Sequence, residues 1–120
     1  MPMSVTLLKS KIHRATVTDA NLEYEGSVSI CPKLIEAAKL LIHEQIDVYN
    51  CNNGERFTTY VIKGKEGEIC LNGAAARKVQ KGDLVILATY ASMPDTEAFE
   101  FKPSVVMVTS RNEVKNLHRP

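Results

Sequence analysis

The stretch of this sequence most suited to unusual chemistry is Glu25-Gly26-Ser27. A serine hydroxyl directly after a glycine can attack the carbonyl of that glycine, because glycine has no Cβ in the way and tolerates strained backbone angles. The attack would convert the Gly26–Ser27 amide into an ester. Loss of the Ser27 α-proton would then eliminate the ester, cut the chain and leave a residue that hydrolyses to a pyruvoyl group. The tripeptide is also an ordinary surface turn, so its meaning depends on residues elsewhere.

The composition is that of one ordinary domain. Its 120 residues suffice for a single hydrophobic core, and 44% hydrophobic and 24% charged residues are normal proportions. Fifteen Lys and Arg against fourteen Asp and Glu give a net charge of +1, which does not attract nucleic acid or an anionic membrane. The sequence has no apolar run long enough for a signal peptide or a membrane span. We expect one cytoplasmic domain over residues 1–120 that binds neither nucleic acid nor membrane.

The cysteines argue against a metal site. Cys31, Cys51 and Cys70 are far apart in the sequence and form no CxxC pair, which disfavours zinc and thioredoxin-type sites. An odd number of scattered cysteines favours free thiols in a reducing compartment. We therefore expect no metal.

The elements that would position Ser27 are mainly β. Asn53-Gly54 between two β-branched runs, 46–50 and 56–62, is the strongest short hairpin signal. The apolar run 84–90 predicts a buried central strand. Further short strands are expected at 3–8, 15–18, 28–30, 68–71 and 104–109, a loop or helical turn at 93–97, and a loosely held polar tail from residue 111.

One helix stands out before the tail. Pro32 suits a first helical turn, and Leu34, Ala37, Ala38 and Leu41 follow at the spacing of one apolar stripe. Many short strands with one brief helix predict a small β-barrel, which leaves no edge strand exposed.

Six sequence blocks together are specific for a known family. They are Lys11-Ile-His-Arg14, Tyr24-Glu-Gly-Ser27, Asn53-Gly-Glu-Arg-Phe-Thr-Thr-Tyr60, Asn72-Gly-Ala-Ala-Ala76, Gly82-Asp83 and Met93-Pro-Asp95. In this order and spacing the sequence resembles the aspartate 1-decarboxylases, pyruvoyl-dependent enzymes that make β-alanine for pantothenate biosynthesis. The resemblance runs from about residue 7 to residue 113.

The resemblance implies a six-stranded double-psi β-barrel with one or two short helices, assembled as a homotetramer with active sites between subunits. It also implies self-cleavage between Gly26 and Ser27 into a β chain, 1–26, and an α chain, 27–120. The α chain would begin with a covalently bound pyruvoyl group derived from Ser27. A helper protein for maturation is a further partner that the resemblance leaves open.

The implied substrate, L-aspartate, would form a Schiff base with the pyruvoyl group, which accepts electrons as CO2 leaves. Its two carboxylates need fixed positive charges. Arg56 offers a planar fork suited to bidentate carboxylate binding. Lys11 offers a second charge, and His13 a donor that can be protonated near neutral pH.

The resemblance assigns further roles. Tyr60 would return a proton to the substrate α-carbon, and Thr59 would polarise the Gly26 carbonyl during self-cleavage. Tyr24 would position the cleavage site, and Asn72 would donate to the pyruvoyl carbonyl or to the intermediate that follows. The remaining pocket residues would be the backbone of Gly73, Ala74 and Ala75 and the apolar side chain of Ile86.

Plainer interpretations exist for each residue taken singly. Lys11 and Arg56 are of a type that is most often a solvated surface charge, and Tyr60 lies in an alternating strand where it could simply pack. The run 74–76 could be a helix-like turn without a ligand. For Ser27 the functional interpretation is favoured.

Three alternative functions remain open. A non-enzymatic oligomeric β-barrel that binds nucleic acid would need a concentrated basic face, which the balanced charge disfavours. An unprocessed barrel kept for protein contacts would retain the catalytic set by coincidence. A pyruvoyl decarboxylase for another acidic amino acid is the third, although the extra methylene of glutamate would misplace one carboxylate.

Overall fold

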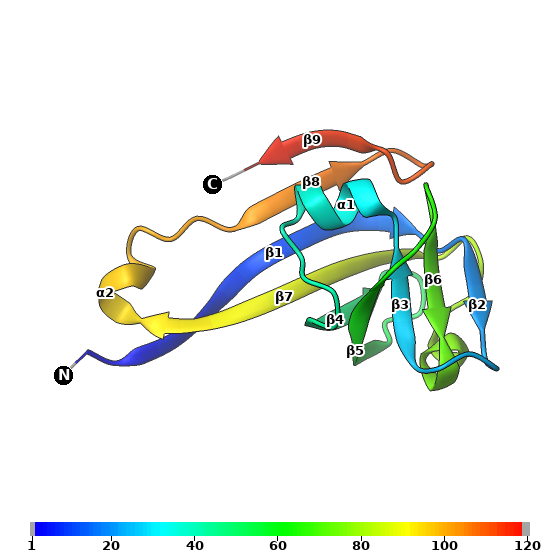
Figure 1. Cartoon of the computed structure of the whole chain (residues 1–120), viewed down its shortest axis with the longest axis horizontal. Coiled ribbons are helices and arrows are strands. Elements are labelled where there is room, and N and C mark those ends of the chain that lie inside the picture. The colour runs from blue at the N-terminus through cyan, green and yellow to red at the C-terminus, as the bar shows by residue number, and fades with distance from the viewer. Residues whose placement is uncertain (1, 119–120) are drawn as a thin grey trace.

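The protein is mainly β, as the sequence predicts. A computed structural model describes residues 2–118, which form an elongated body of 47 × 28 × 25 Å, with the long strands β1 and β7 side by side (Figure 1). The strands are β1 (Ser4–Thr16), β2 (Asp19–Asn21), β3 (Ser27–Ile30), β4 (Gln45–Asn50), β5 (Arg56–Lys63), β6 (Ile69–Asn72), β7 (Leu84–Pro94), β8 (Ser104–Val108) and β9 (Val114–His118). The helices are α1 (Pro32–Ala37), the 3₁₀-helix η1 (Gly73–Lys78) and α2 (Asp95–Ala98).

The first strand is longer than predicted and contains a bulge. The sequence predicts separate strands at 3–8 and 15–18, whereas β1 runs unbroken against β7. In a regular strand Ile12 and Ala15 would face opposite sides. Both are fully buried, because the register shifts between them and Arg14 adopts a φ of +58°. The bulge thus keeps one strand continuous while both apolar side chains reach the core.

The strands pair in the order β2-β6-β3-β5-β4-β7-β1-β8-β9, and the pairs β1–β8, β2–β6 and β3–β5 are parallel. The order ends at β2 and β9, so the closed six-stranded barrel stays a prediction. Between β1 and β2, the backbone N–H of Val17 donates to the Asp83 carbonyl and that of Thr18 to the Ile69 carbonyl, each at 2.8 Å. The chain after β1 therefore contacts both the start of β7 and β6.

The predicted hairpin is confirmed. The strands β4 and β5 pair antiparallel, and Gly54 has a φ of +78°, which a glycine adopts without strain. The side-chain amides of Asn50 and Asn53 both donate to the carbonyl oxygen of Lys78, at 3.1 and 3.0 Å. The hairpin is thereby fastened to the end of η1.

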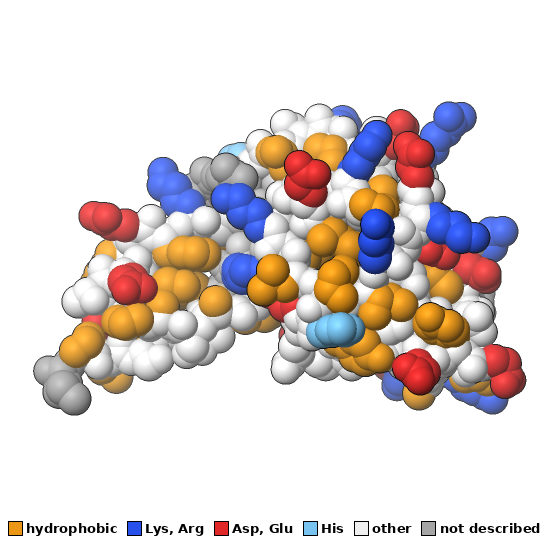
Figure 2. Space-filling view, viewed as in Figure 1, with side chains coloured by type: hydrophobic (Ala, Val, Ile, Leu, Met, Phe, Trp, Pro, Cys, Tyr) orange, Lys and Arg blue, Asp and Glu red, His pale blue; other side chains and the backbone are white. Residues whose placement is uncertain are grey.

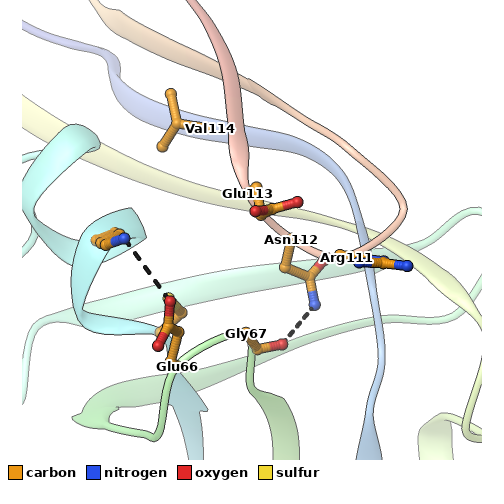
Figure 3. A pocket seen from close by; sticks show the side chains of 8 residues that line it. Glu66, Gly67, Arg111, Asn112, Glu113 and Val114 are labelled. Atoms are coloured by element: carbon orange, nitrogen blue, oxygen red, sulfur yellow. Dashed lines mark hydrogen bonds and ion pairs between the residues drawn. The ribbon is translucent and has the colours of Figure 1, made fainter.

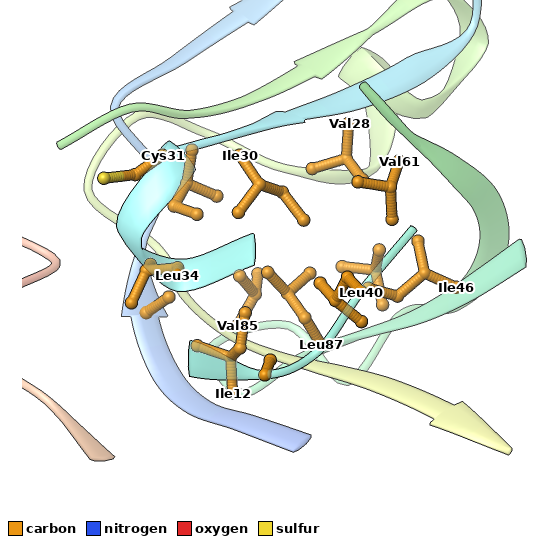
Figure 4. Packing of buried hydrophobic residues seen from close by; sticks show 14 of the residues in the cluster. Ile12, Val28, Ile30, Cys31, Leu34, Leu40, Ile46, Val61, Val85 and Leu87 are labelled. Atoms are coloured by element: carbon orange, nitrogen blue, oxygen red, sulfur yellow. The ribbon is translucent and has the colours of Figure 1, made fainter. Parts of the chain in front are cut away.

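The core lies between the strands and α1 (Figure 4). The run predicted as a continuously buried strand instead alternates at its start: Val85 and Leu87 are buried, whereas Leu84 and Ile86 are half-buried. One face of β7 therefore belongs to the core, and the other, with Leu84 and Ile86, is only partly covered. The largest fully buried side chains are Ile12, Ile30, Leu34, Ile46, Ile69, Leu71 and Leu87.

The helix α1 is shorter than its apolar stripe suggests. It ends at Ala37, and Lys39 takes a φ of +56°, which turns the chain. The spacing predicts Leu41 on the apolar stripe, but Leu41 is 71% exposed and Leu40 is buried instead. The left-handed turn shifts the phase of the side chains, a change that helical periodicity cannot foresee.

The tail after residue 111 is more ordered than predicted. Its residues 114–118 form β9, which pairs antiparallel with β8. Asn112, almost fully buried with a φ of +60°, holds the turn between them. Its Oδ1 accepts from Thr16 N at 2.7 Å, and its Nδ2 donates to the Thr16 carbonyl at 2.9 Å. The same Nδ2 donates to the Gly67 carbonyl at 2.9 Å (Figure 3). One side chain therefore ties the tail to β1 and to the turn before β6.

Asn112→Ala should lower the free energy of unfolding by about 3 kcal/mol, because buried backbone groups lose their partner and alanine tolerates the left-handed φ poorly. Urea-induced unfolding at one protein concentration measures the change. The control is Asn116→Ala at an exposed position of β9, which should change the free energy by less than about 0.5 kcal/mol. Equal stability of both variants would show that Asn112 does not anchor the tail.

Candidate active site

Ser27 is the first residue of β3 and is completely buried. The register between β3 and β6 pairs it with Asn72, whose Nδ2 donates a 3.0 Å hydrogen bond to Ser27 Oγ. The Ser27 hydroxyl itself donates to the carbonyl oxygen of Glu25 at 3.1 Å. The hydroxyl that the sequence singles out is therefore shielded from water and held by two partners.

Gly73 lets two segments approach closely beside Ser27. A Cβ at position 73 would lie 2.7 Å from both N and Cα of Gly26 and 3.1 Å from the carbonyl oxygen of Tyr24. Gly73 also has a φ of +67°, a region that residues with a side chain rarely adopt. The Tyr24 side chain is 55% exposed, so it is the backbone of Tyr24 that packs here. The segment before the predicted cleavage site thus rests on a position that only glycine suits.

A hollow of about 390 Å³ lies beside Gly26, between β5 and η1. It brings together five predicted site residues: Gly26, Thr59, Tyr60, Ala74 and Ala75. Its other lining residues are Phe57, Thr58 and Lys78. The hairpin and η1, which the asparagine bonds described above fasten together, form its walls.

Arg56 stands at the start of β5, directly before the lining residue Phe57. The register aligns Arg56 with Tyr49 of β4, and Tyr49 with Ile86 of β7. These three side chains share the sheet face that points away from the core, here called the outer face. The guanidinium carbon of Arg56 lies 4.1 Å from the centroid of the Tyr49 ring, a cation–π contact.

Tyr49 is itself held firmly. Its hydroxyl donates to Asp47 Oδ2 at 3.1 Å and lies 2.9 Å from the hydroxyl of Tyr90. Asp47 Oδ1 accepts from Thr58 Oγ1 at 2.8 Å. Burial first, and then the hydrogen bonds with Tyr90 and Asp47, raise the pKa of Tyr49, so the hydroxyl stays neutral. The ring under Arg56 is therefore fixed by partners on three strands.

Lys11 and Ile86 are on the outer face but away from Ser27. Lys11 pairs with Ala88, which in turn pairs with Asp47. In the sheet, β5, β4 and β7 lie between β3, which carries Ser27, and β1, which carries Lys11. Neighbouring strands are about 4.8 Å apart, so these strands keep Lys11 at a distance from Ser27. Neither Lys11 nor Ile86 lines the hollow beside Gly26. A single chain therefore does not assemble the whole predicted set in that hollow.

His13 lies in a different place again. It lines a separate hollow with Arg14, Leu84 and Met107 among others. Burial first, and then the positive charges of Lys11 and Arg14, lower the pKa of His13. Its Nδ1 is buried and has no hydrogen-bond partner among residues 2–118. A neutral imidazole with an unused nitrogen is consistent with a contact that this chain alone does not provide.

A further hollow of about 380 Å³ lies at the opposite end of β3, where Cys31 follows the strand. Figure 3 shows the residues around it, and the Lys33 ammonium lies 3.7 Å from the Glu66 carboxylate.

In the part of the chain that the structure describes, no cluster of three His, Cys, Asp or Glu side chains could hold a metal ion. None of the helices between residues 2 and 118 has the length and hydrophobicity that a membrane crossing requires.

The arrangement can be compared with known proteins. The family model described as aspartate decarboxylase matches residues 3–115. The chain belongs to this family. It is similar to the aspartate 1-decarboxylases of Bdellovibrio bacteriovorus (64% identical, over 93% of this chain and 90% of the relative) and Campylobacter hominis (60%, over 92% and 97%). The aspartate 1-decarboxylase of Syntrophus aciditrophicus is 60% identical over 95% of this chain and 100% of its own length. The family resemblance of the sequence is thereby confirmed.

Sequence reasoning misses several residues around the site of this family member. Tyr49 and Asp47 emerge only from the register, although the hairpin signal at 53–54 could have aligned Tyr49 with Arg56. Lys78 lies at the end of η1, which extends two residues beyond the helix-like turn that the run 74–76 suggests. The sequence indicates only a free thiol at Cys70, whereas in the fold its Sγ lies 3.3 Å from Asn72 Oδ1.

Gly73→Ala should lower the free energy of unfolding by roughly 1–3 kcal/mol more than Gly82→Ala. Both glycines have a positive φ, but an added Cβ at Gly82 meets nothing within 4 Å, whereas at Gly73 it collides with Gly26. Urea unfolding of the two variants side by side separates the collision from the backbone strain. Equal losses would mean that the close approach at Gly73 is unimportant.

Proposed function

We propose that this protein is a pyruvoyl-dependent aspartate 1-decarboxylase, a carbon–carbon lyase that converts L-aspartate to β-alanine and CO2 for pantothenate biosynthesis. Membership of the aspartate decarboxylase family and relatives of that name at 53–64% identity support the activity. The structural observation that carries the proposal is the buried Ser27 hydroxyl, which directly follows Gly26 and is bonded to Asn72.

Self-cleavage between Gly26 and Ser27 would produce the β chain, 1–26, and the α chain, 27–120. Ser27 Oγ adds to the Gly26 carbonyl carbon, the C–N bond breaks, and the nitrogen takes the hydroxyl proton, which leaves an ester. A base removes the Ser27 α-proton, the Cβ–Oγ bond breaks, and its electron pair leaves with Oγ as the Gly26 carboxylate. Water then hydrolyses the remaining dehydroalanine to the pyruvoyl group and ammonia. Burial of Ser27 protects the ester from direct hydrolysis.

Two residues are suited to support this cleavage. Thr59 lines the same hollow as Gly26, where its hydroxyl would polarise the Gly26 carbonyl. The backbone of Tyr24 rests against the close contact between Gly26 and Gly73, which would hold the scissile bond in place.

The residues around Ser27 fit a pyruvoyl group at that position. Asn72 Nδ2 lies beside Ser27 and is directed at the Oγ atom that departs with Gly26. After cleavage this N–H loses that partner and would donate to the ketone oxygen on the former Ser27 Cα. When present, the group supplies a ketone that is electrophilic towards an amine and withdraws electrons as CO2 leaves. Asn72 would hold the group, and the backbone of Gly73, Ala74 and Ala75 would border the substrate.

The substrate contacts follow from charge and position. Arg56, supported by the Tyr49 ring, would bind one carboxylate of aspartate in bidentate fashion. Ile86 lies beside Tyr49, which supports Arg56, and would form an apolar wall next to that arginine. Tyr60 lines the hollow, from which its hydroxyl would return a proton to the α-carbon.

We assign Lys11 and His13 to the site of a neighbouring subunit, because in one chain neither lines the hollow beside Gly26. This assignment supports a homotetramer with its active sites between subunits. The highly exposed apolar side chains of Leu41 and Phe99 are available for contacts between subunits.

The finer points of the fold belong to the same proposal. We expect a six-stranded double-psi barrel that closes where Val17 and Thr18 bond to Asp83 and Ile69. We also place the enzyme in the cytoplasm, where pantothenate precursors and free thiols would be found. A purified chain that cuts itself would need no helper protein for maturation.

The alternative of a nucleic-acid-binding barrel finds less support. Basic and acidic side chains are interspersed on the face seen in Figure 2, without a basic stripe. A decarboxylase for another acidic amino acid shares the site and would be distinguished by comparing kcat/KM for aspartate and glutamate.

Ser27→Ala should leave one intact chain without decarboxylase activity, because the variant has no hydroxyl to attack Gly26. Mass spectrometry under denaturing conditions should show two fragments for the wild type, joining at residues 26 and 27, and one species near 13.3 kDa for the variant. Ser104→Ala, another buried serine, is the control and should still be cut. A cleaved and active Ser27→Ala chain would refute the mechanism.

Arg56→Ala should still cut itself but lose about 100-fold in kcat/KM for aspartate, since one charged bidentate contact disappears. Steady-state kinetics on the cleaved enzyme measures this. The control Arg111→Ala, on the distant hollow at Cys31, should retain wild-type kcat/KM. Wild-type turnover by Arg56→Ala would identify Arg56 as a surface charge.

A further inference from the structure

Four polar side chains form a buried group on the face of β3 and β6 that points away from the core. The register pairs Ser27 with Asn72 and Ser29 with Cys70, so the four side chains are neighbours on one face of the two strands. All four are between 0% and 8% exposed. We call this set, Ser27, Ser29, Cys70 and Asn72, the Ser27 quartet.

The hydrogen bonds in the quartet form a chain of donors that leads from Cys70 through Asn72 to the two serines. The Cys70 thiol donates to Asn72 Oδ1 at 3.3 Å. Asn72 Nδ2 donates to Ser27 Oγ and to Ser29 Oγ, at 3.0 Å each. The Ser27 hydroxyl donates a hydrogen bond to the Glu25 carbonyl oxygen at 3.1 Å. Each donor on the Asn72 amide and its oxygen therefore has a partner.

The thiol supports the orientation of the Asn72 amide. An asparagine amide can turn over and exchange its oxygen and nitrogen in nearly the same space. The Ser27 hydroxyl donates its hydrogen to the Glu25 carbonyl, so Ser27 Oγ can only accept a bond from Asn72. Asn72 provides an N–H there only when its Nδ2 faces Ser27 and its Oδ1 faces Cys70. Burial first, and then the charges of Glu68 and Asp19, raise the pKa of Cys70, which keeps the thiol protonated as a donor.

This orientation matters for the bond that breaks. When the Cβ–Oγ bond of the ester is cleaved, negative charge grows on Ser27 Oγ as it departs with the Gly26 carboxylate. An N–H that is fixed towards that oxygen in a buried site stabilises the charge more than a flexible donor would. A reversed amide would instead direct its oxygen at the departing atom and oppose the step.

We propose that Cys70 is a positioning residue for self-cleavage, which acts by holding the Asn72 amide with its nitrogen towards Ser27. The inference rests on the proposed self-cleavage and extends it to residues outside the predicted site. Ser29 assists by accepting the second N–H of the same amide.

The test measures the rate of chain cleavage from the moment of synthesis. Wild type, Cys70→Ala and Cys70→Ser are made in a cell-free system, quenched at intervals and analysed by denaturing mass spectrometry. Cys70→Ala should slow cleavage by about five- to ten-fold, the effect of one hydrogen bond on a rate. Cys70→Ser, which retains a hydroxyl donor, should recover to within about two-fold of wild type.

Cys31→Ala is the matched control, since it removes a second buried thiol at the opposite end of β3. It should lose similar thermal stability but cleave at the wild-type rate. If Cys70→Ala does not fold, Ser29→Ala replaces it and should slow cleavage by about two- to five-fold.

The outcomes separate the two proposals. A wild-type chain that stays whole even after warm incubation with a cell extract that could supply a maturation helper refutes the proposed function and this inference with it. Wild-type cleavage together with an unchanged rate in Cys70→Ala, or equal slowing in Cys31→Ala, refutes the inference alone. Slow cleavage in Cys70→Ala that serine rescues supports it.

Discussion

The pairing of β3 with β6 is the constraint on which the rest of the site depends. It sets the completely buried Ser27 opposite Asn72, and burial strengthens a hydrogen bond to a reacting oxygen. The backbone continues from Asn72 into Gly73, whose missing side chain admits Gly26 at van der Waals contact. One strand end therefore supplies both a donor for the hydroxyl and the space for the bond that is proposed to break.

The strand β5 holds residues for two different proposed roles, one beside Gly26 and one on the outer face. The strand β5 carries the hollow-lining Thr59 and Tyr60 beside Gly26, while its first residue, Arg56, lies on the ring of Tyr49 over β4. A guanidinium over an aromatic ring keeps its charge and its planar fork but loses freedom, which favours selective carboxylate binding. Positive charges further along the outer face, such as Lys11, are too far round the sheet to join it within one chain.

The distribution of charged and polar groups explains why assembly and activity would be linked. His13 keeps a lowered pKa and a buried nitrogen that has no partner among residues 2–118, and Lys11 lies on the outer face opposite Ala88, away from the hollow beside Gly26. Such groups are costly to leave without partners. A neighbouring subunit that presents a hollow for a dicarboxylate would satisfy them, and the site would then exist only in the oligomer.

The sequence by itself determined the family, the mainly β class and the hairpin at Asn53-Gly54, because these depend on local motifs, and it singled out Ser27 as the residue for the proposed chemistry. It could not foresee the bulge at Arg14, the strand β9, or the early end of α1 before Leu41, since left-handed backbone turns there alter which side chains face inward. Tertiary structure alone decided that Cys70 meets Asn72 and that Tyr49 supports Arg56. Those contacts arise from strand register, which is set by packing of the whole sheet rather than by any short stretch of residues.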